Sequence, residues 1–151
     1  MIDTTLCHIE KDGKWLMLYR NKKENDLNEG KWVGIGGKLE PGETADACNL
    51  REVHEETGLK LLDARPQGVV HFRSDKWEDE EMYLYTASEF EGELKEDCDE
   101  GRLEWIPREE ILNLNLWAGD RLFIEPLLNG EEHIALTLCY EGEKLVSWSY
   151  D

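Results

Sequence analysis

The stretch GKLEPGETADACNLREVHEETGL, residues 37–59, decides the fold of this chain. Its pattern predicts a helix over residues 44–57. Thr44 is a suitable N-cap for that helix, and Asp46 places a negative charge in the first turn, where the helix dipole favours it. Gly58 stands where a residue with positive φ commonly ends a helix. Both ends of the helix can therefore be read directly from the sequence.

Acidic residues dominate the second half of this helix. Glu52, Glu55 and Glu56 are spaced i, i+3 and i+4, so their side chains are predicted to share one face. A glutamate run is usually a solvated surface, but like charges one turn apart destabilise a helix, and no lysine is interleaved here. We therefore interpret the three carboxylates as ligands for a hard divalent cation. The opposite face, expected to lie against a sheet, carries Ala47, Leu50, His54 and Thr57.

The spacing of this stretch resembles the Nudix box. That motif reads glycine, five residues, glutamate, seven residues, and then Arg-Glu-apolar-x-Glu-Glu-x-Gly-apolar. Every fixed position is matched without a gap, by Gly37, Glu43, Arg51, Glu52, Val53, Glu55, Glu56, Gly58 and Leu59. The resemblance implies an α/β fold, the Nudix α/β/α sandwich with a mixed sheet. It also implies a hydrolase that acts on phosphoric anhydride bonds.

The resemblance further implies a bound Mg²⁺, with Mn²⁺ as a substitute, held by the helix glutamates and the carbonyl of Gly37. A further ligand is expected from the acidic loop before the strand that ends at Trp105, where Glu100 is our choice and Asp99 the alternative. Arg51 is expected to orient this set by pairing with Glu43 or with a ligand glutamate. The carboxylate that takes the proton from water is expected among Glu52, Glu55, Glu56 and Glu100.

Composition limits the partners. A length of 151 residues suggests a single domain, residues 1–151, and 17 basic against 35 acidic residues give a net charge of −18. Such a surface should repel nucleic-acid polymers and anionic membranes, and an anionic small substrate would need a cation to screen the charge. The four cysteines lack C-x-x-C spacing, and the first ten residues lack the features of a signal peptide. We expect free thiols, a cytoplasmic protein and a monomer or homodimer.

The rest of the chain alternates between strand and helix patterns. The polar stretch 21–30 is predicted to be a loop, in which Lys22 and Lys23 either are solvated or meet phosphates. Val70, Phe72, Met82 and Leu84 are expected on inward strand faces, where one or two could line a base pocket. Strands are predicted at residues 3–10, 14–20, 32–38, 65–74, 81–90, 132–140 and 143–150, and helices at 107–112 and 120–128.

Four residues outside the box are candidate substrate contacts. Trp117 either fills the core or stacks on a nucleobase, and Asp120 could read the edge of that base. Arg20, at the end of a strand, is a candidate for phosphate binding, and Lys38 is either a phosphate contact or an ordinary exposed lysine.

The segment around Trp117 resembles the base-recognition segment of MutT-type enzymes, which remove oxidised purine nucleoside triphosphates. It carries Gly119 beside Asp120 instead of paired aspartates, and Val33 replaces an asparagine before the box. The leading hypothesis is a pyrophosphohydrolase of 8-oxo-dGTP or related purines. The alternatives are the same chemistry on a pyrimidine triphosphate, ADP-ribose or a dinucleotide polyphosphate, and a nucleotide-sensing module without catalysis.

Overall fold

The computed structural model describes residues 1–22 and 28–151, except for the side chain of Asp97. The predicted loop over residues 21–30 therefore falls partly outside the described residues, as does the prediction for Lys23. No helix in the described part of the chain combines the length and apolar character needed to cross a membrane.

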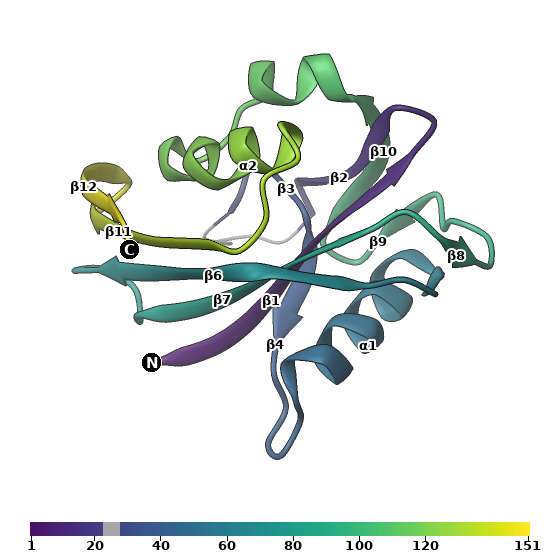
Figure 1. Ribbon diagram of the computed structural model, residues 1–151, viewed down its shortest axis with the longest axis horizontal. Helices are drawn as coiled ribbons and strands as arrows, with labels where there is room; N and C mark the ends of the chain where they lie inside the picture. Colours follow the sequence, from purple (N-terminus) through teal and green to yellow (C-terminus); the bar gives the residue numbers. More distant parts are fainter. Residues whose placement is uncertain (23–27) are drawn as a thin grey trace.

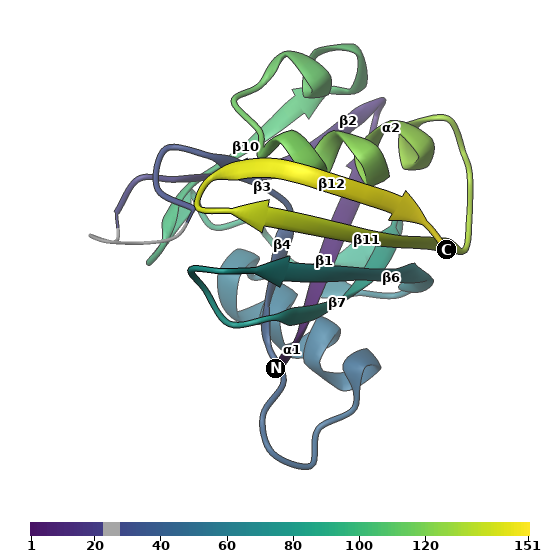
Figure 2. The same ribbon diagram turned by 90° about the vertical axis from the view of Figure 1, so that its left-hand side faces the viewer.

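A mixed β-sheet forms the centre of the molecule (Figure 1). Its strands follow the order β12-β11-β6-β7-β1-β2-β10-β9, with β3 beside β2 and β4 beside β1. The β1–β7 and β11–β6 pairs are parallel, and β12 forms an edge next to β11 (Figure 2). Their bounds are β1 Ile2–Lys11, β2 Lys14–Arg20, β3 Trp32–Val33, β4 Ile35–Lys38, β6 Arg65–Ser74, β7 Glu80–Ala87, β9 Asp97–Cys98, β10 Gly101–Pro107, β11 Ile134–Glu141 and β12 Lys144–Tyr150. A separate small sheet pairs β5 Lys60–Leu61 with β8 Phe90–Glu91.

Strand β1 pairs with β4 along its first half and with β2 at its end, and the β4 pairing positions Gly36 and the first glycine of the box, Gly37. Its first half pairs with β4, from Thr4 opposite Lys38 to Cys7 opposite Ile35, while its last residues pair with β2. The strands lie so close at Gly36 that a Cβ there would be 1.7 Å from the carbonyl oxygen of Thr5. Only glycine fits such an approach.

Helix α1, Ala45–Thr57, has the ends that the sequence predicts. The Thr44 side chain accepts a hydrogen bond from the Ala47 amide, and Gly58 has a φ of 82°. The predicted orientation of the helix is wrong, because Ala47, Leu50 and His54 are exposed and only Thr57 of that set is buried. The face that packs on the sheet consists of Cys48, Asn49, Val53, Glu56 and Thr57.

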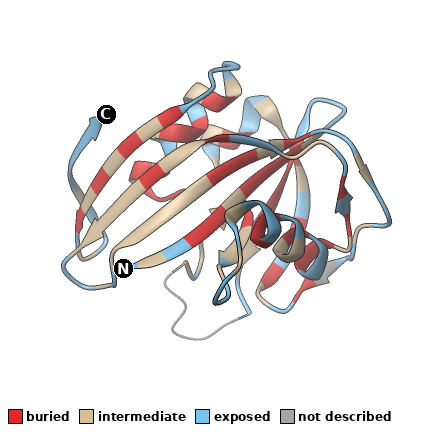
Figure 3. Ribbon diagram, turned by 60° about the horizontal axis from the view of Figure 1, so that its bottom comes forward, coloured by how far each residue is buried: buried red, intermediate tan, exposed pale blue. Residues whose placement is uncertain are grey.

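The sheet has a hydrophobic core on each face (Figures 1 and 3). On the α1 side, Val53 and Leu59 pack among Cys7, Ile9 and Leu16. The other side is covered by the 3₁₀ helices η1, Arg108–Asn113, and η2, Ala118–Asp120, and by helix α2, Arg121–Leu128. Phe123, Ile124 and Leu127 of α2 are buried there. Helices on both faces of a mixed sheet confirm the predicted α/β architecture.

Candidate active site

A single arginine organises the acidic side of helix α1. Arg51 forms ion pairs with Glu43, Glu52 and Glu55, and its guanidinium also donates to the carbonyl oxygen of Lys38. The expected pairing of Arg51 with Glu43 or with a ligand glutamate is therefore confirmed, and Arg51 is a counter-ion for Glu52 and Glu55. Their surroundings also differ, since the Glu55 side chain is 57% exposed whereas that of Glu52 is 16% exposed.

Glu56 is the buried member of the acidic set. Burial, followed by the neighbouring carboxyl of Glu100 and the charges of Glu100 and Glu52, holds the pKa of Glu56 well above its usual range. Its Oε2 atom is buried and makes no hydrogen bond with any described residue. Glu100 in turn pairs with Arg20, whose Nη1 lies 3.3 Å from Glu100 Oε2. The acid expected from the distant loop thus lies beside the helix acids.

The local geometry fits a hard cation. A Cβ built on Gly37 would lie 2.4 Å from the carboxyl carbon of Glu52, so only glycine leaves room between this backbone and that side chain. The buried Oε2 of Glu56 has no hydrogen-bond partner among the described residues, so it is available as a metal ligand. Oxygen atoms of this kind are the preferred ligands of Mg²⁺. The set is not preassembled, because no group of three acidic, histidine or cysteine side chains in the described ranges is already placed to hold a metal ion.

A cavity of about 540 Å³ lies next to the acidic cleft. Its walls include Val70, Phe72 and Met82, so three of the four named strand residues line the cavity, where one or two were expected. Glu100 lines both this cavity and the cleft formed with Glu52, Glu55 and Glu56. A ligand could therefore extend from a chamber of ordinary ligand-site size, lined by both apolar and charged side chains, into a carboxylate cluster.

Trp117 both packs in the core and lines this cavity. Its side chain is 6% exposed, meets Tyr140 edge to face at 5.5 Å, and donates from Nε1 to Asn28 Oδ1 at 2.8 Å. The two alternatives for Trp117 are thus compatible. Asp120 lines the same cavity, and burial together with the charge of Glu80 raises the pKa of Asp120 to about 7.

The remaining predicted contacts also lie around this cavity. Arg20 and Lys38 line it, Arg20 in its ion pair with Glu100 and Lys38 as an exposed side chain. Lys22 is exposed, as predicted, and also borders the acidic cleft. Sequence reasoning missed Thr4, Asn28 and Glu80, which also line the cavity. Thr4 and Glu80 each lie an even number of positions from inward-facing residues of their strands, so they are on the inward face. That signal alone does not separate them from ordinary strand residues.

Comparison with known proteins identifies this arrangement. A profile of the NUDIX domain matches residues 3–127, and the site described above lies within that range.

The chain belongs to the Nudix family.

Its relatives agree with this assignment. The chain is 30% identical to an uncharacterized Nudix hydrolase, YvcI, of Bacillus subtilis, over 97% of this chain and 92% of the relative. It is 31% identical to an oxidized purine nucleoside triphosphate hydrolase of Danio rerio, over 94% and 88% of the two chains. The crystal structure of a MutT protein from Bacillus halodurans superposes with a TM-score of 0.90 at 28% identity, covering 100% of this chain and 98% of that chain.

The family assignment settles the reaction class. The protein is a Nudix hydrolase that acts on pyrophosphate bonds, and Nudix enzymes bind small nucleotide substrates with the help of a divalent metal ion. The sequence-based expectations of a Nudix fold and of an enzyme of this class are therefore confirmed.

Proposed function

We propose that the protein hydrolyses oxidised purine nucleoside triphosphates such as 8-oxo-dGTP, with Mg²⁺, to the nucleoside monophosphate and pyrophosphate. The observation that carries this proposal is that Glu100 lines both the cavity and the acidic cleft. A flat heterocycle suits the apolar part, while a phosphate chain with its counter-ions suits the acidic part. The name of the Danio rerio relative, an oxidized purine nucleoside triphosphate hydrolase, supports the same substrate class.

The acidic residues would hold the cation in this proposal. The ligands would come from Glu52, Glu55, Glu56 and Glu100 together with the carbonyl of Gly37. When bound, Mg²⁺ supplies neutralisation of the phosphate charge and a lowered pKa for water in its coordination sphere, where Mn²⁺ can replace it. Arg51 would keep Glu52 and Glu55 in position through the ion pairs described above.

The chain itself would orient the substrate and move one proton. Arg20 and Lys38 line the cavity on the side of Gly37 and Glu100, where they can meet phosphate oxygens. A water molecule attacks phosphorus in line with the leaving oxygen, the P–O bond of the anhydride breaks, and a carboxylate of the cluster takes the proton. The glutamate that accepts this proton would be one of Glu52, Glu55, Glu56 and Glu100.

A substrate panel tests the proposal. The purified protein is incubated with Mg²⁺ and 8-oxo-dGTP, the ordinary triphosphates, ADP-ribose or a diadenosine polyphosphate, and the products are separated by ion-exchange chromatography. We expect the highest kcat/KM for 8-oxo-dGTP, with monophosphate and pyrophosphate as products. A higher kcat/KM for CTP, ADP-ribose or the dinucleotide would refute the substrate assignment.

The Glu56→Gln protein, purified in the same way, controls for contaminating phosphatases. We expect its turnover to fall by about a hundredfold or more, since a charged oxygen ligand is replaced by a neutral amide. Near-normal turnover of this variant would reject Glu56 as a metal ligand. Turnover of no substrate by the unmodified protein would favour a nucleotide-sensing module.

A further inference from the structure

A second carboxyl, that of Glu80, lines the same cavity as Asp120. Glu80 is the first residue of β7, and its side chain lies on the same wall as Met82, two residues further along the strand. The Thr4 hydroxyl of the neighbouring strand β1 donates to Glu80 Oε2 at 2.6 Å. This hydrogen bond fixes the carboxyl at one point of the cavity wall.

Neither carboxyl has a strong partner within the protein. Among the described residues, Thr4 is the only hydrogen-bond donor to the Glu80 side chain, and no side-chain cap hydrogen bond is formed by Asp120 at the start of α2. No arginine or lysine forms an ion pair with either residue in the described part of the chain. Burial raises the pKa of Glu80, against the weaker effects of Thr4 and Lys38. Enclosed carboxyls with so few donors are costly unless a ligand supplies the missing hydrogen bonds.

The two carboxyls also act on one another. Glu80 and Asp120 line the same cavity, and the charge of Glu80 raises the pKa of Asp120, second only to burial, so the two carboxylates repel when both are ionised. A ligand that carries adjacent N–H donors would relieve this repulsion and satisfy both carboxyls. A ligand that offers ring nitrogens with lone pairs at those positions would add to the repulsion.

We propose that Glu80, positioned by Thr4, is a base-reading residue that acts with Asp120 to select nucleobases carrying a 2-amino group next to a ring N–H. This inference rests on the proposed function, because it takes the cavity to be the base site. Guanine and 8-oxoguanine have this pair of donors on one edge. Hypoxanthine keeps the ring N–H but lacks the amino group, and adenine presents an unprotonated ring nitrogen instead.

Paired substrates that differ only in the 2-amino group test the proposal. We expect kcat/KM for dGTP to exceed that for dITP by about tenfold or more, the typical worth of one hydrogen bond to an enclosed charged group. In Glu80→Gln, which keeps the shape but removes the charge, this ratio should fall to about threefold or less. Thr4→Val should lower the ratio in the same direction, because it releases the Glu80 carboxyl while leaving Glu80 itself in place.

Glu78→Gln is the matched control. Glu78 lies two residues before Glu80, is 57% exposed on its side chain and pairs with the terminal amine of Met1, so its replacement removes the same charge outside the cavity. We expect the Glu78→Gln protein to keep the dGTP/dITP ratio of the unmodified protein. Circular dichroism verifies that each variant is folded.

Binding without turnover separates this inference from the proposed function. Affinities for dGMP and dIMP are measured in EDTA from the quenching of tryptophan fluorescence. A preference for dGMP that is lost in Glu80→Gln supports the role of Glu80, even if no triphosphate is hydrolysed and the proposed function fails. The role is overturned if the unmodified protein binds dGMP and dIMP equally, binds neither, or keeps its preference in Glu80→Gln.

Discussion

Glu43 accepts two parallel hydrogen bonds from Arg51, with Nε 2.8 Å from Oε2 and Nη2 2.9 Å from Oε1. The remaining guanidinium nitrogen, Nη1, reaches Glu52 at 2.7 Å and Glu55 at 3.2 Å. The hydrogen bonds that Glu43 accepts from Arg51, with a further one from the backbone of Glu40, lower the pKa of Glu43 to about 2. One planar cation therefore links the start of the Nudix box to two of its carboxylates.

Replacement of Arg51 by lysine tests whether Arg51 acts through its positive charge alone or through the geometry of its hydrogen bonds. Lysine keeps the positive charge, but it cannot bind Glu43 through two nitrogens and reach Glu52 and Glu55 at the same time. We expect kcat to fall by about tenfold or more, and the Mg²⁺ concentration for half-maximal activity to rise, while the fold is retained. Mg²⁺ titrations of activity and a thermal melt provide the test. Unchanged Mg²⁺ dependence would show that Arg51 does not position the metal ligands.

The pH dependence of the protein's stability should reveal the titration of the Asp120 carboxyl. Its pKa is raised to about 7 from the usual value near 3.8, so between these values the folded protein holds a proton that the unfolded chain has released. This contribution therefore makes the metal-free protein less stable as pH rises through that window. The Asp120→Asn protein should lose less stability over this pH range than the unmodified protein. We expect its drop in Tm between pH 5 and pH 8 to be smaller by about 2 °C or more. An identical drop in both proteins would contradict this.

The position of α1 shows where sequence reasoning succeeds and where it fails. The ends of the helix follow from local chemistry, a hydroxyl cap at Thr44 and a left-handed residue at Gly58, and both are confirmed. The buried face was assigned wrongly because apolar periodicity assumes an apolar interior. Here the interior face includes Asn49 and Glu56, while Leu50 is 45% exposed. A helix that buries functional carboxylates does not have the pattern of one that buries only a hydrophobic stripe.

The cavity was predictable only in part. Trp117 and Asp120 were identified because an aromatic and an acid stand out in a short loop segment. Glu80 and Thr4 were missed because their meeting depends on the parallel pairing of β1 with β7, which joins residues separated by 76 positions. Position 119 has a glycine where paired aspartates would place an acid. A Cβ at this position would lie 2.6 Å from the Tyr140 hydroxyl oxygen, so the packing here leaves little room for a side chain. Long-range register of this kind cannot be inferred from local patterns.

Two variants of Trp117 distinguish its role in packing from its role in binding. Trp117→Ala should lower stability by about 3–5 kcal/mol, as expected for removal of a buried indole, and would lower activity on all substrates. Trp117→Phe keeps an aromatic ring but loses the hydrogen bond to Asn28. We expect its KM for the preferred purine nucleotide to rise more than its kcat falls. Steady-state kinetics and thermal melts measure both effects, and equal losses for every nucleotide in Trp117→Phe would indicate a purely structural residue.

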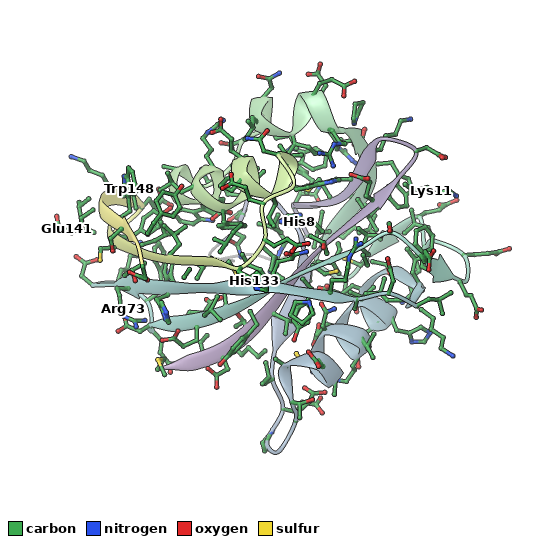
Figure 4. All side chains as sticks on the ribbon, viewed as in Figure 1. His8, Lys11, Arg73, His133, Glu141 and Trp148 are labelled. Carbon is green, nitrogen blue, oxygen red and sulfur yellow. The ribbon has the colours of Figure 1, made fainter. Side chains whose placement is uncertain are left out.

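His8 should make the fold sensitive to acid. Its ring lies on the α2 side of β1 (Figure 4), stacked on Trp15 at a centroid distance of 4.5 Å, and neither ring nitrogen has a hydrogen-bond partner among the described residues. Burial lowers the pKa of His8 to about 3, so between pH 6.5 and pH 3 the unfolded chain binds a proton that the folded protein excludes. The His8 contribution is therefore fully present above pH 6.5 and is lost as pH falls through this window. His8→Phe keeps a ring of similar shape without a titratable group, so urea unfolding should give a smaller loss of stability between pH 7 and pH 4.5 than in the unmodified protein. Parallel pH profiles of the two proteins would mean that His8 is protonated, or becomes exposed, in the folded state.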